Sequence, residues 1–120
     1  MLEPEIYSYP EPNLDDMETT FHDRNHDVPA EEVTYALRKL DSVVGQFDLV
    51  ARAEVEFDRD LKKRAIPLYV VKVNLHLIGH RLSDLYAEET GRELRATVDL
   101  VIDKIGRELV TLKDRVTAHP

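Results

Sequence analysis

The sequence predicts an α+β domain in which four strands form one sheet and two helices pack on one face of it, in the order β-α-β-β-β-α. Three patterns predict this fold: a long apolar stripe at helical spacing near the C-terminus, a shorter one in the first half, and alternating apolar segments between them. Each stripe needs an apolar surface to cover, and a sheet face supplies it. At 120 residues, the chain is long enough for one domain with its own core.

The segment from Gly91 to Val116 predicts the longer helix. Its apolar residues recur every three or four positions, which places them along one side of a helix of about seven turns. The stripe consists of Leu94, Val98, Val101, Ile105, Leu109, Leu112 and Val116. Charged residues fill most of the positions between them, so the opposite side faces water. We expect this helix to begin at Thr90 or Gly91.

The first half of the chain predicts one strand followed by one helix. Residues Glu18–His22 carry threonine and phenylalanine side chains, which suit a pleated sheet. The helix is predicted over Pro29–Val44, with Pro29 at its first position and Asp27 as the candidate N-cap. Its apolar stripe consists of Val33, Leu37, Leu40 and Val44.

Three further strands are predicted between the helices. Leu49–Asp58 alternates apolar and charged residues, and Leu68–Ile78 alternates most strongly. The basic segment Arg59–Pro67 joins them as a loop. The last strand, Arg81–Glu88, alternates poorly, which predicts a bulge or an edge position. The residues expected to point into the core are Ala53, Val55, Phe57, Tyr69, Val71, Val73, Leu75 and Leu77.

The net charge of −8 is concentrated at the N-terminus. Residues 1 to 32 contain ten acidic residues against one arginine, which leaves fourteen acids and fifteen bases for residues 33 to 120. Residues 1 to 17 show no periodicity and are predicted to be a disordered acidic tail. An alternative is that this tail mimics phosphate, or docks through Ile6, Tyr7 and Tyr9. Residues 18 to 117 form the predicted domain, and residues 118 to 120 are its end or the start of a linker.

The composition argues against several classes of protein. Without cysteine, neither a disulfide framework nor a cysteine-ligated zinc site can form. No apolar run approaches the roughly 18 residues that a membrane span needs, and the N-terminus lacks the basic and then apolar pattern of a signal peptide. We therefore expect a soluble cytoplasmic protein with no membrane partner.

No enzyme motif is present in the sequence. The four glycines are scattered singly, and there is no cysteine nucleophile or serine in a strained elbow. His22 and His26 are four residues apart, as are His76 and His80. This spacing brings two ligands to one metal only on a helix, whereas both pairs are predicted on strand and turn. Surface histidines are the simpler interpretation, and a metal site at residues 22 to 27 is the alternative. We expect no catalysis, no metal, no cofactor and no small-molecule substrate.

Basic residues are the remaining candidates for a functional surface. They occur on both predicted helices, in the loop and on the outer sheet face. Gathered on one side, they would supply the salt-sensitive affinity for phosphates on which nucleic-acid binding depends. Ordinary solvated helix faces, interlaced with Glu and Asp, explain the same composition. Composition alone leaves both interpretations open.

Two stretches of the sequence carry a further signal. The first is TTFHDRNHDVPAEEVTYALRKL, which has a short strand, a turn and a helix that ends in a Lys-Leu pair, here Lys39 and Leu40. The second is ELRATVDLVIDKIGRELVTLKDR, which has spaced aspartate, lysine and leucine residues and a basic end. Together they resemble the ribosome hibernation-promoting factor family, which includes protein Y, the ribosome-associated inhibitor. The resemblance covers about residues 18 to 117, and the loop at residues 59 to 64 resembles the actinobacterial members.

The resemblance implies a protein that docks on the small ribosomal subunit in the channel for mRNA and tRNA. Such a protein blocks initiation of translation and keeps ribosomes inactive but intact under stress or in stationary phase. It contacts ribosomal RNA by shape and through phosphates, without catalysis or a cofactor. The residues implied in RNA contact are Arg38, Lys39, Lys104, Arg107, Lys113 and Arg115, followed by Lys62, Lys63, Arg64 and Lys72.

The sequence departs from the family in three respects. Family members are usually more basic, whereas Glu108 and Asp114 dilute the charge of the last helix. The acidic leader is longer than the usual start. Long members add a linker and a dimerisation domain that pairs ribosomes, so we expect this chain to be a short form or part of a long one, with a homodimer only through such a domain. The alternative function is a protein-interaction module on the same fold that has lost ribosomal RNA binding.

Overall fold

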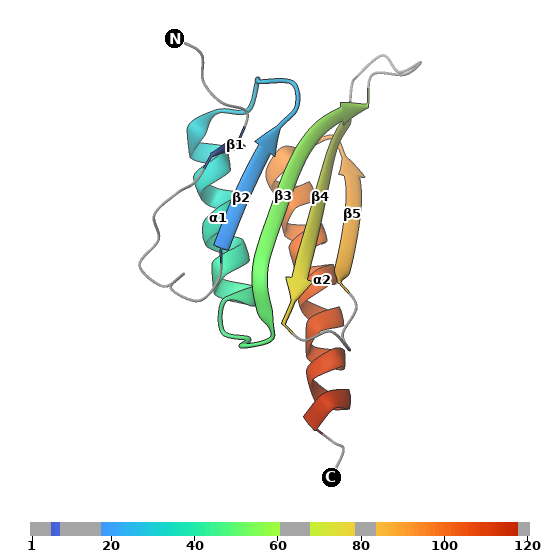
Figure 1. Ribbon diagram of the computed structural model, residues 1–120. Coiled ribbons are helices and arrows are strands. Elements are labelled where there is room, and N and C mark those ends of the chain that lie inside the picture. The colour runs from blue at the N-terminus through green and yellow to red at the C-terminus, as the bar shows by residue number, and fades with distance from the viewer. Residues whose placement is uncertain (1–5, 8–17, 61–67, 79–83, 118–120) are drawn as a thin grey trace.

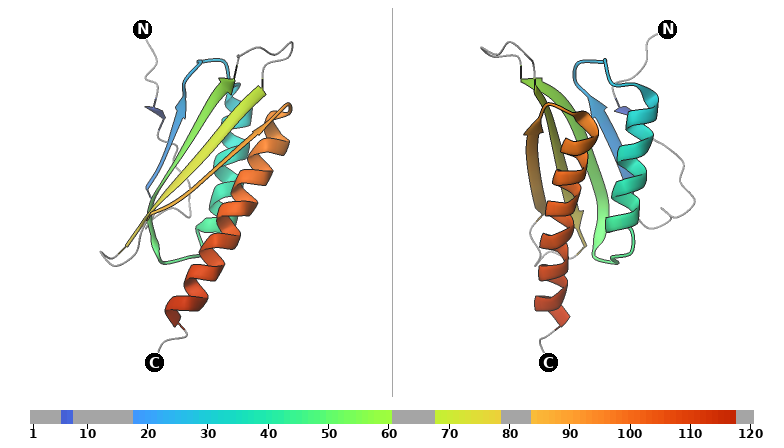
Figure 2. Two further views of the ribbon diagram at one scale, coloured as in Figure 1. Left: turned by 90° about the vertical axis from the view of Figure 1, so that its right-hand side faces the viewer. Right: turned by 180° about the vertical axis from the view of Figure 1, so that it is seen from behind.

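The computed structural model describes residues 6–7, 18–60, 68–78 and 84–117. These residues form a sheet of five strands and two helices in the chain order β1-β2-α1-β3-β4-β5-α2. Both helices lie on one face of the sheet and leave the other face open (Figure 1 and Figure 2). The predicted β-α-β-β-β-α fold is confirmed, with the short strand β1 added before it.

The strands lie side by side in the order in which they occur in the chain. β2 (Glu18–Asp23) and β3 (Val50–Asp60) are parallel, and α1 supplies the long crossover that a parallel pair needs. β4 (Leu68–Leu77) and β5 (Leu85–Gly91) follow as antiparallel neighbours. β5 lies at the edge of the sheet. Its poor alternation predicted either a bulge or an edge position, and the edge position is the one observed.

At the other edge, β1 (Ile6–Tyr7) pairs antiparallel with β2. These two residues belong to the segment predicted as a disordered tail. The remainder of that segment lies outside the described residues, as do the end of the chain at 118–120, most of the predicted basic loop at 61–67 and the turn at 79–83.

The inner face of the sheet and the two helices form the core. The alternate residues of β3 and β4 that were predicted to point inward are buried, namely Ala53, Val55, Phe57, Val71, Val73 and Leu75. Tyr69 and Leu77, also predicted inward, are half-buried. From β2, Phe21 meets the ring of Phe57 edge-on, with 4.8 Å between the ring centroids. This contact joins the two parallel strands near the C-terminal end of β2, where Phe57 lies opposite Asp23.

The first helix, α1 (Ala30–Val44), buries the predicted stripe of Val33, Leu37, Leu40 and Val44. The predicted Asp27 cap is wrong, because Pro29 occupies the N-cap position and makes no side-chain cap bond. Asp27 instead forms an ion pair with Arg59 at 3.4 Å. The turn into α1 is held by buried Asp23, whose Oδ2 accepts a hydrogen bond from the Val28 N–H at 2.8 Å.

The second helix, α2 (Leu94–Thr117), begins later than predicted. Thr90 and Gly91 are still part of β5 and pair with β4. A Cβ at Gly91 would lie 2.4 Å from the Thr97 Oγ1, so only glycine lets the strand end pass this close to the first turn of the helix. The predicted last strand, Arg81–Glu88, is correspondingly shifted toward the C-terminus.

The long stripe of α2 anchors it on the sheet. Val98, Val101, Ile105 and Leu109 are fully buried as predicted, together with Ile102, which the stripe did not include. With 24 residues, α2 is about 36 Å long, more than the strands that it covers. Its last turns therefore extend past the end of the sheet, as Figure 1 and Figure 2 show.

Candidate nucleic-acid interface

Three of the predicted RNA-contact residues lie on one side of α2. Lys104, Arg107 and Arg115 line a groove of about 440 Å³ beside the start of β5. The other lining residues are Leu85, Leu112, Thr111 and one acid, Glu108. Lys104 and Arg107 are three residues apart and Arg115 follows eight residues later, about two turns on, so helical geometry brings the three cations to the same side. We call this surface the α2 basic groove.

The cations of the α2 basic groove differ in their pairing. Lys104 Nζ lies 3.5 Å from Glu89 Oε2 on β5. Arg107 and Arg115 are exposed, and neither forms an ion pair with any residue that the structure describes. Two guanidinium groups are thus available for an external anion, for which their planar fork of donors is suited.

A second group of cations lies on α1 and the first turn of α2. Arg38, Lys39 and Arg95 line a groove of about 400 Å³, which we call the α1 groove. Lys39 Nζ is held between Asp99 at 3.6 Å and Asp103 at 3.8 Å. Arg38 is exposed and has no ion-pair partner within the described ranges. Of the two predicted residues here, Arg38 is therefore the more available to phosphate.

Arg95 was not singled out from the sequence. Its guanidinium stacks on the Tyr35 ring at 4.5 Å and its Nε donates to Glu32 at 2.8 Å. The Tyr35 hydroxyl donates to Asp99 at 2.6 Å, and this hydrogen bond, with burial, raises the pKa of Tyr35. Glu32 and Arg95 are 63 residues apart, so the local sequence pattern could not predict this contact between the two helices.

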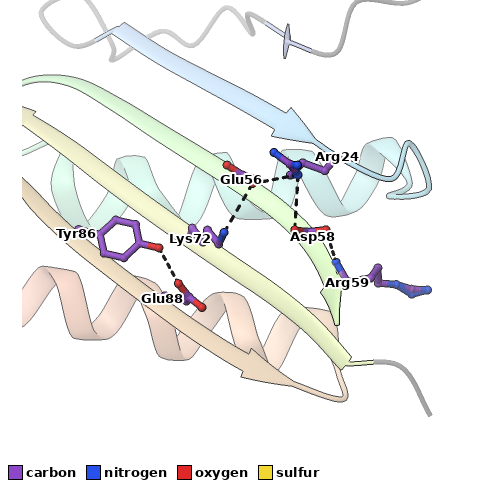
Figure 3. A network of polar contacts seen from close by, with 7 residues as sticks. All are labelled: Arg24, Glu56, Asp58, Arg59, Lys72, Tyr86 and Glu88. Atoms are coloured by element: carbon purple, nitrogen blue, oxygen red, sulfur yellow. Dashed lines mark hydrogen bonds and ion pairs between the residues drawn. The ribbon is translucent and has the colours of Figure 1, made fainter. Parts of the chain in front are cut away.

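The open face of the sheet carries charge of a different kind (Figure 3). Arg24 lies 3.5 Å from Glu56 and 3.6 Å from Asp58, and Lys72 lies 4.0 Å from Glu56. Lys72 is on the outer face, as predicted, but on the opposite side of the sheet from the helices. Among the predicted RNA-contact residues that the structure describes, Lys72 is the one on this face, and it already lies next to a carboxylate.

The rest of the open face continues this network. Arg52 pairs with Glu54 at 3.6 Å, and His76 lies between Glu54 at 3.4 Å and Asp84 at 2.9 Å. Tyr86 donates to Glu88 at 2.7 Å. Local desolvation and this hydrogen bond raise the pKa of Tyr86 to about 12.

The remaining predicted residues are divided between described and undescribed segments. Lys113 lies near the end of α2 with its Nζ 5.5 Å from the centroid of the Phe47 ring. Lys62, Lys63 and Arg64 lie outside the described residues. Their predicted roles in RNA contact, like those of the other seven residues, stay predictions.

The described part of the chain contains no group of three or more His, Asp or Glu side chains arranged to hold a metal ion. His22 lies on β2 and His26 on the following turn, as predicted. None of the described helices is apolar over a length sufficient to cross a membrane.

The sequence and the fold place the chain in a known class of protein. Residues 19–117 match the family described as "Sigma 54 modulation protein / S30EA ribosomal protein", and the chain belongs to this family. It is 34% identical over 94 residues to the ribosome hibernation promoting factor of Klebsiella oxytoca, which covers 73% of this chain and 90% of that protein. The factor of the same name from Escherichia coli K12 is 33% identical over the same shares. The resemblance read from the sequence is confirmed.

Solved structures support the fold. A ribosomal subunit interface protein from Coxiella burnetii superposes with a TM-score of 0.63 at 18% identity, covering 81% of this chain and 96% of that one. The N-terminal domain of Thermus thermophilus protein Y gives 0.59 at 18% identity, covering 78% and 93%.

Proposed function

We propose that this chain is a cytoplasmic ribosome hibernation factor. It binds the small ribosomal subunit in the channel for mRNA and tRNA, inhibits translation and preserves inactive ribosomes under stress. It does so by shape and phosphate contacts, and it is not an enzyme. The names of its relatives, ribosome hibernation promoting factor and ribosomal subunit interface protein, support this proposal.

The observation that carries the proposal is the α2 basic groove. Arg107 and Arg115 are exposed there without carboxylate partners among the described residues, next to Lys104. Phosphates that replace water and counterions around such cations give the electrostatic affinity of RNA-binding proteins. The whole-chain charge of −8 does not oppose this, because ten of the 24 acids lie in residues 1 to 32.

The test is sedimentation of the protein with purified small ribosomal subunits through sucrose, at low and at physiological salt. We expect co-sedimentation that weakens as salt rises, since each neutralised phosphate adds to the salt dependence. The paired substitution Lys104→Glu with Arg107→Glu should remove it. Protein that stays at the top of the gradient at low salt would refute the proposal for this chain.

A matched control is available elsewhere on the surface. Arg52→Glu with Arg92→Glu changes the net charge by the same amount at two exposed positions outside both grooves. We expect this variant to co-sediment nearly as well as the wild type. If both pairs lose binding equally, the effect is one of net charge and the α2 basic groove has no special part in it.

The second candidate is a protein-interaction module on the same fold that has lost ribosomal RNA binding. The ion pairs of Lys39, Lys72 and Lys104 favour it, because each is already occupied by a carboxylate. Such a module would bind a protein partner with little dependence on salt. Absence of binding to ribosomal RNA at any salt concentration, with retained binding to a protein, would support it.

A further inference from the structure

A third groove lies between the C-terminal end of α1 and the second half of α2. It measures about 640 Å³ and is mainly apolar, with Val43, Phe47 and Val110 along it. Val110 is 48% exposed, so its apolar side chain is accessible at the surface of the groove. We call this groove the apolar slot.

The slot exists because α2 carries a glycine where the two helices meet. A Cβ on Gly106 would lie 2.6 Å from Val43 Cγ1, so any side chain there would press on α1. Glycine lets the helices come close at this point, and Gly106 and Val43 both line the slot next to the contact. The slot is therefore formed by the helix packing itself.

The rim of the slot is polar and carries two charges, Arg107 and Asp103, and the Asp103 carboxylate lies 3.8 Å from Lys39 Nζ. Arg107 lines both the apolar slot and the α2 basic groove, so the two surfaces are continuous. Lys113 adds a second positive charge beside the Phe47 ring. Gln46 and Thr111 line the rim as well, and they can both donate and accept hydrogen bonds.

We infer that the apolar slot accepts an unpaired nucleobase of an RNA strand whose phosphates lie along the α2 basic groove. Proteins bind single-stranded RNA by placing bases against apolar and aromatic side chains while basic residues follow the backbone. The slot offers both features side by side, and Arg107 joins them. A base within a duplex could not enter, so the site selects unpaired nucleotides. This inference rests on the proposed function and specifies its RNA partner.

Arg107 on the rim argues for RNA as the occupant. An apolar protein segment would bury Val110 and Phe47 equally well, but it would leave Arg107 beside an apolar partner, where a guanidinium is costly to desolvate. A ribonucleotide places its phosphate at that position. Asp103 also lines the slot, but it is paired with Lys39, whereas Arg107 has no ion pair among the described residues, so charge complementarity favours a nucleotide phosphate next to Arg107.

The test compares two probes by fluorescence anisotropy at low salt: a short single-stranded RNA of mixed sequence, and the same ribose-phosphate oligomer without bases. We expect the wild type to bind the RNA about tenfold more tightly than the abasic oligomer, as expected for one stacked base. Val110→Glu should bind both probes with similar affinity, because the carboxylate occupies the mouth of the slot.

Leu100→Glu is the matched control. Leu100 is 56% exposed on the same helix and does not line the slot. This variant introduces the same charge and should keep the preference for the RNA over the abasic oligomer. Because both positions are exposed, we expect both variants to fold, and their melting curves verify this.

Equal binding of the two probes by the wild type would overturn the inference, as would an equal loss of preference in both variants. Sedimentation with small subunits separates this result from the proposed function. Subunits bound without any base preference would refute the slot alone. A base preference without subunit binding would refute the proposed function and leave the slot in place.

Discussion

The open face of the sheet and the exposed side of α2 both carry basic side chains, but these differ in whether a carboxylate lies next to them. On the open face of the sheet, Arg24, Arg52 and Lys72 each lie within 4.0 Å of a carboxylate. On the exposed side of α2, Arg107 and Arg115 have no such partner in the described part of the chain. Paired surface charges add little to stability and offer little to a phosphate, whereas unpaired arginines retain their donors. Pairing, more than the number of charges, therefore distinguishes the candidate RNA surface.

The largest effect is expected where α2 is anchored. Leu109→Ala should lower the free energy of unfolding by about 2–5 kcal/mol, because it empties a fully buried site on the side of α2 that faces the sheet. The adjacent change Val110→Ala, at a half-exposed position, should alter it by about 0.5 kcal/mol or less. Urea unfolding of both variants measures the difference. Similar losses would mean that α2 is not seated as described.

The salt dependence of RNA binding distinguishes the two faces directly. Arg107→Ala should reduce the slope of log K against log salt for single-stranded RNA by about 0.7, the contribution of one phosphate contact. Arg52→Ala, on the open face, should leave the slope unchanged because its guanidinium already faces Glu54. Titrations at several salt concentrations provide both slopes. An equal change of the slope in the two variants would mean that the two faces do not differ in their contact with RNA phosphates.

A cation that loses its carboxylate partner should become available to bind an RNA phosphate. Asp103→Asn removes one of the two carboxylates beside Lys39 and should raise the affinity for RNA roughly two- to fivefold at low salt. Asp58→Asn removes the same charge from the open face and serves as the control. Anisotropy with one RNA probe compares them. An equal gain in both would indicate a simple effect of net charge.

The smallest effect concerns Tyr86 on the open face. Its pKa is raised to about 12 from 10.0, so the folded state keeps a proton that the unfolded chain releases earlier. The stability linked to this raised pKa, which desolvation and the hydrogen bond to Glu88 cause, is complete below pH 10 and is lost as the pH rises toward 12. Tyr86→Phe should therefore lose less stability than the wild type over this range. The measurement is the urea midpoint of unfolding of both proteins across this pH range. Midpoints that decrease in parallel for the wild type and the variant would contradict the prediction.

Much of the fold could be predicted because apolar residues recur at the short sequence intervals typical of strands and helices. The alternation around Val55 and Val73 and the helical spacing of Ile105 and Leu109 specify which residues are buried without any long-range information. The boundary between β5 and α2 could not be predicted. The pairing of Gly91 with β4 leaves no pattern in the neighbouring residues.

The candidate site was predictable only in part. Helical spacing places Lys104, Arg107 and Arg115 on one side of α2. Which cations are already paired depends on residues far away in the sequence: Lys39 and Asp99 come from different helices, and Lys104 meets a strand residue. The apolar slot was missed for a similar reason, because it requires the contact between Gly106 and α1.

Site-specific photo-crosslinking to small ribosomal subunits tests the central claim most directly. A photoreactive side chain can replace Thr111, which lines the α2 basic groove, or Thr90, an exposed threonine on the outer edge strand. The account predicts crosslinks to ribosomal RNA from position 111 and few or none from position 90. Crosslinks from position 90 with none from position 111 would contradict it and would assign RNA contact to the sheet.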